Sequence, residues 1–187
     1  MKKLTKILSL LVAASMTVML FASCGGAKKS VSDEDAKLMA GRWNAVLCRV
    51  YGIVFTPDQG GQDMVLDFRE DGTLDMTVNG SKSTSTWKKN GDTITADGTA
   101  MKLSGEALRL DIDEDGLPMT MYFAKPGSAA AEPKQYIENG DLTYEDLSDP
   151  TPETARRLLE KVPEEGMAKL GLDAPTVEMI KRLAAMK

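Results

Sequence analysis

The feature that most constrains this fold is a series of glycine-containing turn pairs spaced through the middle of the chain. Asn-Gly and Asp-Gly pairs favour tight β-hairpins, because a type I′ turn needs positive φ at both central residues. Between the turns, apolar and polar residues alternate, as in residues 64–69. Alternation with a period of two is typical of a strand with one buried face. The turn pairs include Asp71-Gly72, Asn79-Gly80, Asp97-Gly98 and Asp115-Gly116.

Residues 39–125 therefore predict a β-meander of about eight strands, the first over residues 42–51. Successive hairpins of this kind close into an up-and-down barrel, which removes exposed sheet edges. The composition changes after Pro126, and residues 126–150 read as a linker. Thr151-Pro152 and Asp173-Ala174-Pro175 then supply helix starts. We expect a mainly β fold, a small up-and-down barrel followed by a short α-helical C-terminal segment over residues 151–187.

The first 24 residues have the pattern of an export signal. Three lysines precede an uncharged apolar run over residues 7–21, which ends at Ala22-Ser23-Cys24. A basic start, a short apolar stretch and small residues at the cut define a signal peptide, and the stretch is shorter than a membrane-spanning helix. We expect residues 1–23 to be removed and residues 24–38 to form a flexible tether.

The segment from Leu20 to Cys24 resembles the bacterial lipobox, with Phe21 in the place of the usual branched aliphatic residue. The resemblance implies cleavage before Cys24 and a diacylglyceryl group on that cysteine. Acyl chains of this kind hold a protein stably on a bilayer. We therefore expect a lipoprotein of the bacterial cell envelope, lipid-anchored to the cell membrane on its extracytoplasmic face. An ordinary cleaved signal is the alternative.

Three short motifs resemble the bacterial lipocalin-like domain: Gly41-Arg42-Trp43, Asp71-Gly72-Thr73 and Ser85-Thr86-Trp87. Serine stands at position 85, where that family commonly has glycine. The resemblance covers residues 39–125 and implies a lipocalin-like barrel, a fold whose members bind small apolar molecules in the barrel mouth. A fold does not fix a function, so the ligand remains an expectation.

Apolar residues on the inward faces of the strands are candidates for a ligand pocket or for an ordinary core. Core packing is the favoured interpretation, because an apolar strand face is first a packing device. Residues 52–63 form the longest break in the β pattern, and we expect them to lie over one mouth of the barrel as a plug or, alternatively, a lid. The candidates are Trp43, Phe55, Met64, Phe68, Met76, Trp87, Met119 and Met121.

Charge and composition argue against several classes of function. The chain has 23 basic and 28 acidic residues, and without residues 1–23 the balance is 20 to 28, a net charge of −8. Such an acidic protein is not suited to nucleic acid. The chain contains no histidine, which removes the imidazole of Ser-His and Cys-His catalysis and of common zinc sites. We expect a protein that is not an enzyme and has no cofactor.

Asp111, Asp113 and Asp115 have the opening spacing of a calcium loop, and they form a weak metal-site hypothesis. Position 122 is tyrosine, whereas a calcium loop ends in a bidentate glutamate, and the flanking residues read as strands. An acidic hairpin that faces water is the favoured interpretation. Cys48 is expected to be a buried, inert thiol.

Two functions stay open at this stage. In the first, the protein is a non-catalytic binding module that holds a small apolar ligand in the barrel mouth near Trp43. In the second, the barrel is solid and serves protein interaction, with the C-terminal helices as the partner site. A continuous apolar cavity would favour the first. A filled barrel with an exposed apolar stripe on those helices would favour the second.

Overall fold

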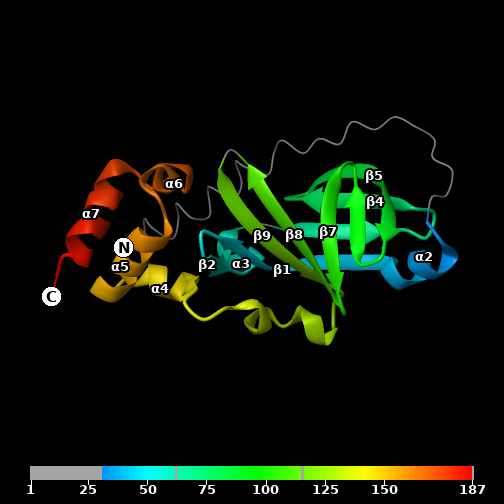
Figure 1. Cartoon of the computed structure of the whole chain (residues 1–187), viewed down its shortest axis with the longest axis horizontal. Helices are drawn as coiled ribbons and strands as arrows, with labels where there is room; N and C mark the ends of the chain where they lie inside the picture. Colours follow the sequence, from blue (N-terminus) through cyan, green and yellow to red (C-terminus); the bar gives the residue numbers. More distant parts are fainter. Residues whose placement is uncertain (1–30, 62, 115, 187) are drawn as a thin grey trace.

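The computed structural model describes residues 31–61, 63–114 and 116–186 and contains a closed β-barrel with helices at both ends (Figure 1). The expected signal peptide and Cys24 lie outside the described residues. Eight antiparallel strands pair in sequence order, and the last pairs with the first. The prediction of an up-and-down barrel with C-terminal helices is confirmed. The barrel strands are β1 (Gly41–Val50), β3 (Met64–Phe68), β4 (Thr73–Val78), β5 (Ser81–Asn90), β6 (Thr93–Ala96), β7 (Thr99–Ser104), β8 (Ala107–Glu114) and β9 (Leu117–Ala124).

The turn pairs close hairpins as the sequence predicts. Asn79 and Gly80, with φ of 49° and 80°, join β4 to β5. Asp97 and Gly98, with φ of 45° and 81°, join β6 to β7. Positive φ at both central residues matches the right-handed twist of the flanking strands, which explains the fixed register of each hairpin.

Residues 53–60 form a strand and a short helix, where the sequence indicated a break in the β pattern. Strand β2 (Ile53–Phe55) pairs antiparallel with the end of β1, and helix α3 (Pro57–Gly60) then packs against β1. The turn between β1 and β2 consists of Tyr51 and Gly52, with φ of 51° and 73°. This turn lacks the usual Asn or Asp, and the strand is too short and uniformly apolar to show alternation.

Strand β1 contains a bulge that turns two consecutive apolar residues outward. The register against β9 shifts between Ala45 and Leu47. Trp43 and Cys48 belong to the main core cluster, whereas Val46 and Leu47 belong to a second cluster. A β-bulge interrupts the alternation in this way. The outer wall of the barrel therefore carries an apolar patch that needs cover.

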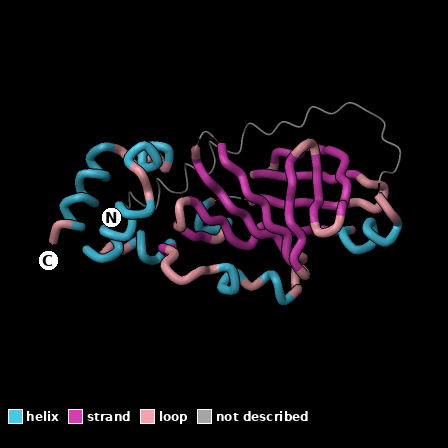
Figure 2. Tube along the Cα trace, in the orientation of Figure 1, coloured by secondary structure: helices cyan, strands magenta, loops and turns pink. Residues whose placement is uncertain are grey.

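Residues 126–143, which we call the strap, provide this cover (Figure 2). The strap contains two 3₁₀ helices, η2 (Ala129–Ala131) and η3 (Pro133–Tyr136), and ends in β10 (Leu142–Thr143). Strand β10 pairs in parallel with β2. The expectation of a simple linker over residues 126–150 is therefore corrected, because much of this stretch packs on the barrel.

The C-terminal helices close one end of the barrel and share its core. Leu158, Val162 and Ile180 lie in the same apolar cluster as Val50 and Ile53. No helix among the described residues is long and apolar enough to span a membrane. The helical part begins earlier than residue 151: it comprises α4 (Tyr144–Ser148), α5 (Pro152–Lys161), α6 (Glu164–Lys169) and α7 (Ala174–Ala184).

A close backbone approach fixes α6 on this end of the barrel. A Cβ atom added to Gly166 would lie 3.0 Å from the ring of Tyr51, which is tighter than most real Cβ contacts. The hydroxyl of Tyr51 donates to the carbonyl of Gly116 in the β8–β9 turn. One tyrosine thus joins the first barrel strand, the last hairpin and the helical segment.

Helix α2 (Asp33–Met39) covers the opposite end (Figure 1). Trp43 Nε1 donates to the carbonyl oxygen of Met39 at 2.8 Å, and Lys89 pairs with Asp35 at 2.7 Å. Residues 33–38 are therefore helical, where the sequence predicted a tether. Ser32 caps the helix, and Ala36 and Met39 are buried, so the segment gains contacts that an isolated tether lacks.

Aromatic side chains fill the barrel interior. The ring of Phe68 meets Trp43 and Trp87 edge to face, with centroids 6.3 and 5.2 Å apart. Aromatic pairs in this geometry add to the free energy of burial. Further side chains that are almost fully buried are Leu66, Ile94, Leu108, Met121 and Phe123.

Asp75 is a buried charge on the barrel wall, with only 3% of its surface exposed. It accepts a hydrogen bond from Thr84 at 2.6 Å and pairs with Lys82 at 2.9 Å and with Arg69. Burial by itself would raise the pKa of this carboxyl, but the hydrogen bonds of Thr84 and Lys82 and the charge of Arg69 outweigh burial and lower it. The folded state therefore favours ionised Asp75.

We expect Phe68→Ala to lower the free energy of unfolding by about 3–5 kcal/mol, because it leaves a cavity between two indole rings. Denaturant unfolding followed by tryptophan fluorescence measures this loss. Thr95→Ala, at an exposed strand position, is the control and should cost under about 1 kcal/mol. Similar losses for the two variants would contradict an aromatic-filled interior.

We expect Asp75→Asn to destabilise the protein by about 2 kcal/mol near pH 7. The pKa of Asp75 is lower in the folded than in the unfolded state, so its contribution is present above the unfolded pKa of about 4. The contribution is lost as the pH falls through the folded pKa. Urea titrations from pH 7 to pH 3 should show that the difference in free energy of unfolding between the wild type and Asp75→Asn shrinks. A difference that stays constant would refute the ionisation of Asp75 as the origin of the effect.

Candidate binding groove beside the strap

The eight apolar candidates from the sequence lie in one core cluster or pack against it. Seven of them are buried, and Met76 is partly buried. Trp43 lies beneath α2, and Phe55 lies on β2, which flanks β1. The structure thus brings these side chains together as packing partners within the barrel.

The acidic hairpin residues lie on the outer face of the sheet. Asp111 accepts from Thr120 at 2.7 Å and pairs with Arg109 at 2.9 Å, while Asp113 accepts the backbone N–H of Gly116 at 3.0 Å. Asp115 lies outside the described residues. Among the residues with described positions, no group of three cysteine, aspartate or glutamate side chains is arranged to hold a metal ion.

Cys48 points into the barrel core from β1. Burial raises the pKa of its thiol to about 12. A protonated, enclosed thiol is a poor nucleophile, because the thiolate is the reactive form.

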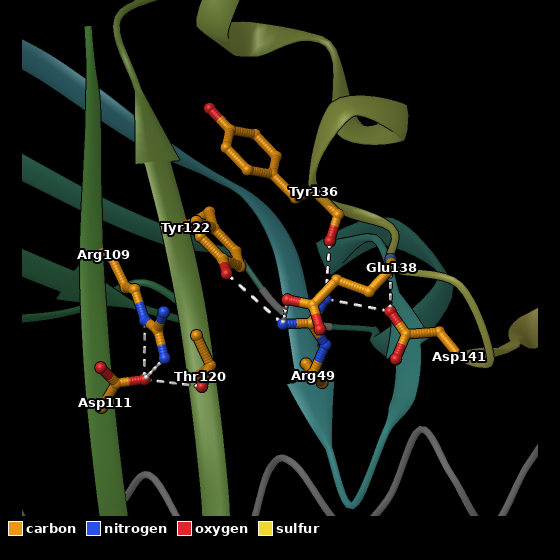
Figure 3. A network of polar contacts seen from close by, with 8 residues as sticks. All are labelled: Arg49, Arg109, Asp111, Thr120, Tyr122, Tyr136, Glu138 and Asp141. Atoms are coloured by element: carbon orange, nitrogen blue, oxygen red, sulfur yellow. Dashed lines mark hydrogen bonds and ion pairs between the residues drawn. The ribbon is translucent and has the colours of Figure 1, made fainter. Parts of the chain in front are cut away.

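Arg49 ties the strap to the barrel (Figure 3). Its guanidinium donates to the carbonyl of Tyr136 at 2.7 Å, contacts Asp141 at 2.9 Å and pairs with Glu138 at 2.9 Å. The side chain is only 13% exposed. Burial alone would lower the pKa of Arg49, but its bond to Asp141 outweighs burial and raises it. The cation is therefore held permanently at this position.

Two stacked tyrosines lie beside this ion pair. Tyr122 on β9 and Tyr136 on the strap have ring centroids 4.3 Å apart and an interplanar angle of 17°. Tyr136 donates its hydroxyl proton to the carbonyl of Ala130 at 2.8 Å, and burial raises its pKa. Both rings are therefore fixed in place.

A groove of about 520 Å³ opens between the strap and the outer face of strands β7 to β9. Its volume falls in the range typical of small-molecule sites. Further grooves of about 430 and 400 Å³ border other parts of the strap. The side chains that matter for the first groove are Lys102, Ala107, Arg109 and Tyr122 on the barrel and Gln135 and Tyr136 on the strap.

The strand register places the charged residues of this groove side by side. Lys102 lies directly opposite Arg109, and Arg109 lies directly opposite Tyr122. Like charges at such positions repel each other. Asp111 offsets the charge of Arg109, whereas Lys102 has no ion-pair partner within the described part of the chain. The site therefore presents a lysine without an ion pair among the described residues next to an aromatic stack.

Sequence reasoning missed this groove and Arg49. The signal available was slight: an arginine between two apolar residues, Cys48 and Val50, in the first strand. Its partner Asp141 lies 92 residues later, in a segment that reads as a linker.

Comparisons of this chain with protein-family models, curated proteins and solved structures found no match. The lipocalin-like resemblance therefore rests on the short motifs and on the closed eight-stranded antiparallel barrel.

We expect Arg49→Gln to lower the free energy of unfolding by about 3 kcal/mol, because it leaves Asp141 shielded from water without its cation. Hydrogen exchange should also speed up at Leu142, whose N–H donates to the carbonyl of Gly52. Arg156→Gln is the matched control, since Arg156 pairs with Glu153 on an exposed helix face. Its cost should stay below about 1 kcal/mol. Equal effects would rule out Arg49 as the anchor of the strap.

Proposed function

We propose that this protein is a membrane-anchored extracytoplasmic lipoprotein whose solid β-barrel serves as a non-catalytic binding module. The export pattern and the lipobox-like segment that ends at Cys24 support the anchor. The observation that carries the proposal is the aromatic-filled interior of the barrel, with helices over both ends. Binding is therefore assigned to the outer surface.

The packing of the interior favours the solid barrel over an apolar ligand in the mouth. A ligand would have to displace Trp43, Phe68 or Trp87 from contacts in which each is at least 98% buried. Protein interiors are close-packed, so such displacement costs free energy that a surface groove does not require.

The groove beside the strap is the binding surface that this proposal favours. The strap is held by Arg49, by the tyrosine stack and by the pairing of β10 with β2. Walls that are ordered before binding reduce the entropy lost when a ligand is captured. This preorganisation supports a role in recognition.

The C-terminal helices offer a second candidate surface for a partner protein. Met179 on α7 and Met186 just beyond its end are 42% and 58% exposed, and Leu183 between them is partly buried. Met179 and Leu183 are four residues apart, which places them on one face of α7. Exposed methionines suit adaptable apolar contacts, so Met179 and Met186 support the interaction role.

The ionisation of Asp111, the ion-pair partner of the groove residue Arg109, supports a role without catalysis. Burial would raise the pKa of Asp111, but its hydrogen bonds to Arg109 and Thr120 and the charge of Arg109 lower it. General acids need the opposite shift to stay protonated near neutral pH. Asp111 therefore suits an ion pair better than proton transfer.

We expect Cys24→Ser to abolish incorporation of an alkyne-tagged fatty acid during expression in a bacterial host. The wild-type chain should carry the tag and sediment with the membrane fraction, because acyl chains supply the anchor. Cys48→Ala is the matched control, since it removes the only other cysteine, and it should keep both properties. Tagging that survives Cys24→Ser would refute the anchor.

A further inference from the structure

We infer that the groove between the strap and strands β7 to β9 binds a small organic anion with a flat apolar body, such as an aromatic carboxylate or sulfonate. The inference rests on the proposed function, in which binding occurs outside the barrel. It adds the chemical class of the ligand, argued from the charge and shape of the groove.

The charge of the groove points to an anion. Lys102 is exposed and lies directly opposite Arg109, so two cations share one patch of the sheet. Arg109 contacts Asp111 through Nε and Nη2, at 3.0 and 2.9 Å. Its Nη1 has no partner among the described residues. An anion between Lys102 and Arg109 would relieve their mutual repulsion and accept hydrogen bonds from both.

Acidic groups at the groove offset part of this positive charge. Among the charged lining residues, Glu106 of the β7–β8 turn stands against Lys102 and Arg109. Glu106 and Lys102 are both exposed, so water screens their charges alike. Asp111 is already engaged with Arg109 and Thr120. The site can therefore accept one negative charge at the Lys102 side.

The apolar part of the ligand has a defined place. Ala107 and Tyr122 form part of the floor, and Ala129 and Tyr136 form part of the wall. The wall is held by Gln135, whose Nε2 donates to the carbonyls of Ala129 and Glu132 at 2.9 and 3.0 Å. Small side chains beside fixed aromatic rings leave room for a flat group and hold it by dispersion and ring contacts.

The test compares two probes that share one ring system. Naphthalene-2-sulfonate carries the anion, and naphthalene-2-sulfonamide is its neutral analogue. Titration calorimetry on the full chain in a non-ionic detergent should show at least about five-fold tighter binding of the sulfonate. Lys102→Gln should weaken sulfonate binding by about three-fold to ten-fold and leave sulfonamide binding unchanged.

Two further variants locate the binding site. Lys88→Gln removes an exposed lysine of β5 that does not line the groove, and it should bind both probes as the wild type does. Ser104→Trp places an indole in the groove from the end of β7 and should abolish binding of both probes. Circular dichroism verifies that each variant folds. If Ser104→Trp does not fold, the effect of Lys102→Gln on the affinity for the sulfonate decides the test.

Equal affinity for the two probes, equal effects of Lys102→Gln and Lys88→Gln, or no saturable binding would each overturn the inference. Binding of a poly-glutamate peptide without binding of the sulfonate would also overturn it and assign the groove to acidic peptides. None of these outcomes bears on the proposed lipid anchor, which the fatty-acid labelling of Cys24 tests separately.

Discussion

The pairing of β1 with β9 is the constraint on which the rest of the structure depends. This ladder joins the first and last strands of the meander and removes the two edges that an open sheet would expose. Its register shifts at the bulge between Ala45 and Leu47. The bulge turns Val46 and Leu47 outward, and the apolar patch that they form requires a cover. The strap and its grooves follow from this one irregularity.

The closed ends of the barrel have a related physical cause. A barrel of short strands has a small core, and each added helix enlarges the apolar volume removed from water. Met39 extends the core at one end, and Leu158 and Ile180 extend it at the other. The barrel and the helical segment thus share one continuous core cluster. A site inside such a barrel would compete with the packing that stabilises it, which supports the proposal that binding occurs on the outer wall.

Charged groups determine where the strap lies on the wall. Arg49 contacts Tyr136, Glu138 and Asp141 from a largely buried position. A buried ion pair adds little net free energy, but loss of one partner is costly, so such a pair selects one arrangement over others. The same arrangement brings Tyr136 onto Tyr122 and leaves Lys102 in the lining of the groove. The electrostatics of the groove are a consequence of how the strap is anchored.

The sequence by itself determined the meander, the closure into a barrel and the starts of two C-terminal helices. Asn79-Gly80 and Asp97-Gly98 specify their turns locally, and Thr151 and Asp173 cap their helices as expected. Only the tertiary structure decided the Tyr51-Gly52 hairpin, the bulge, the course of the strap and the groove. These features depend on contacts such as those of Arg49 with Tyr122 and Asp141, 73 and 92 residues away. Turn propensity and alternation are properties of neighbouring residues, whereas these contacts form only once the barrel has closed.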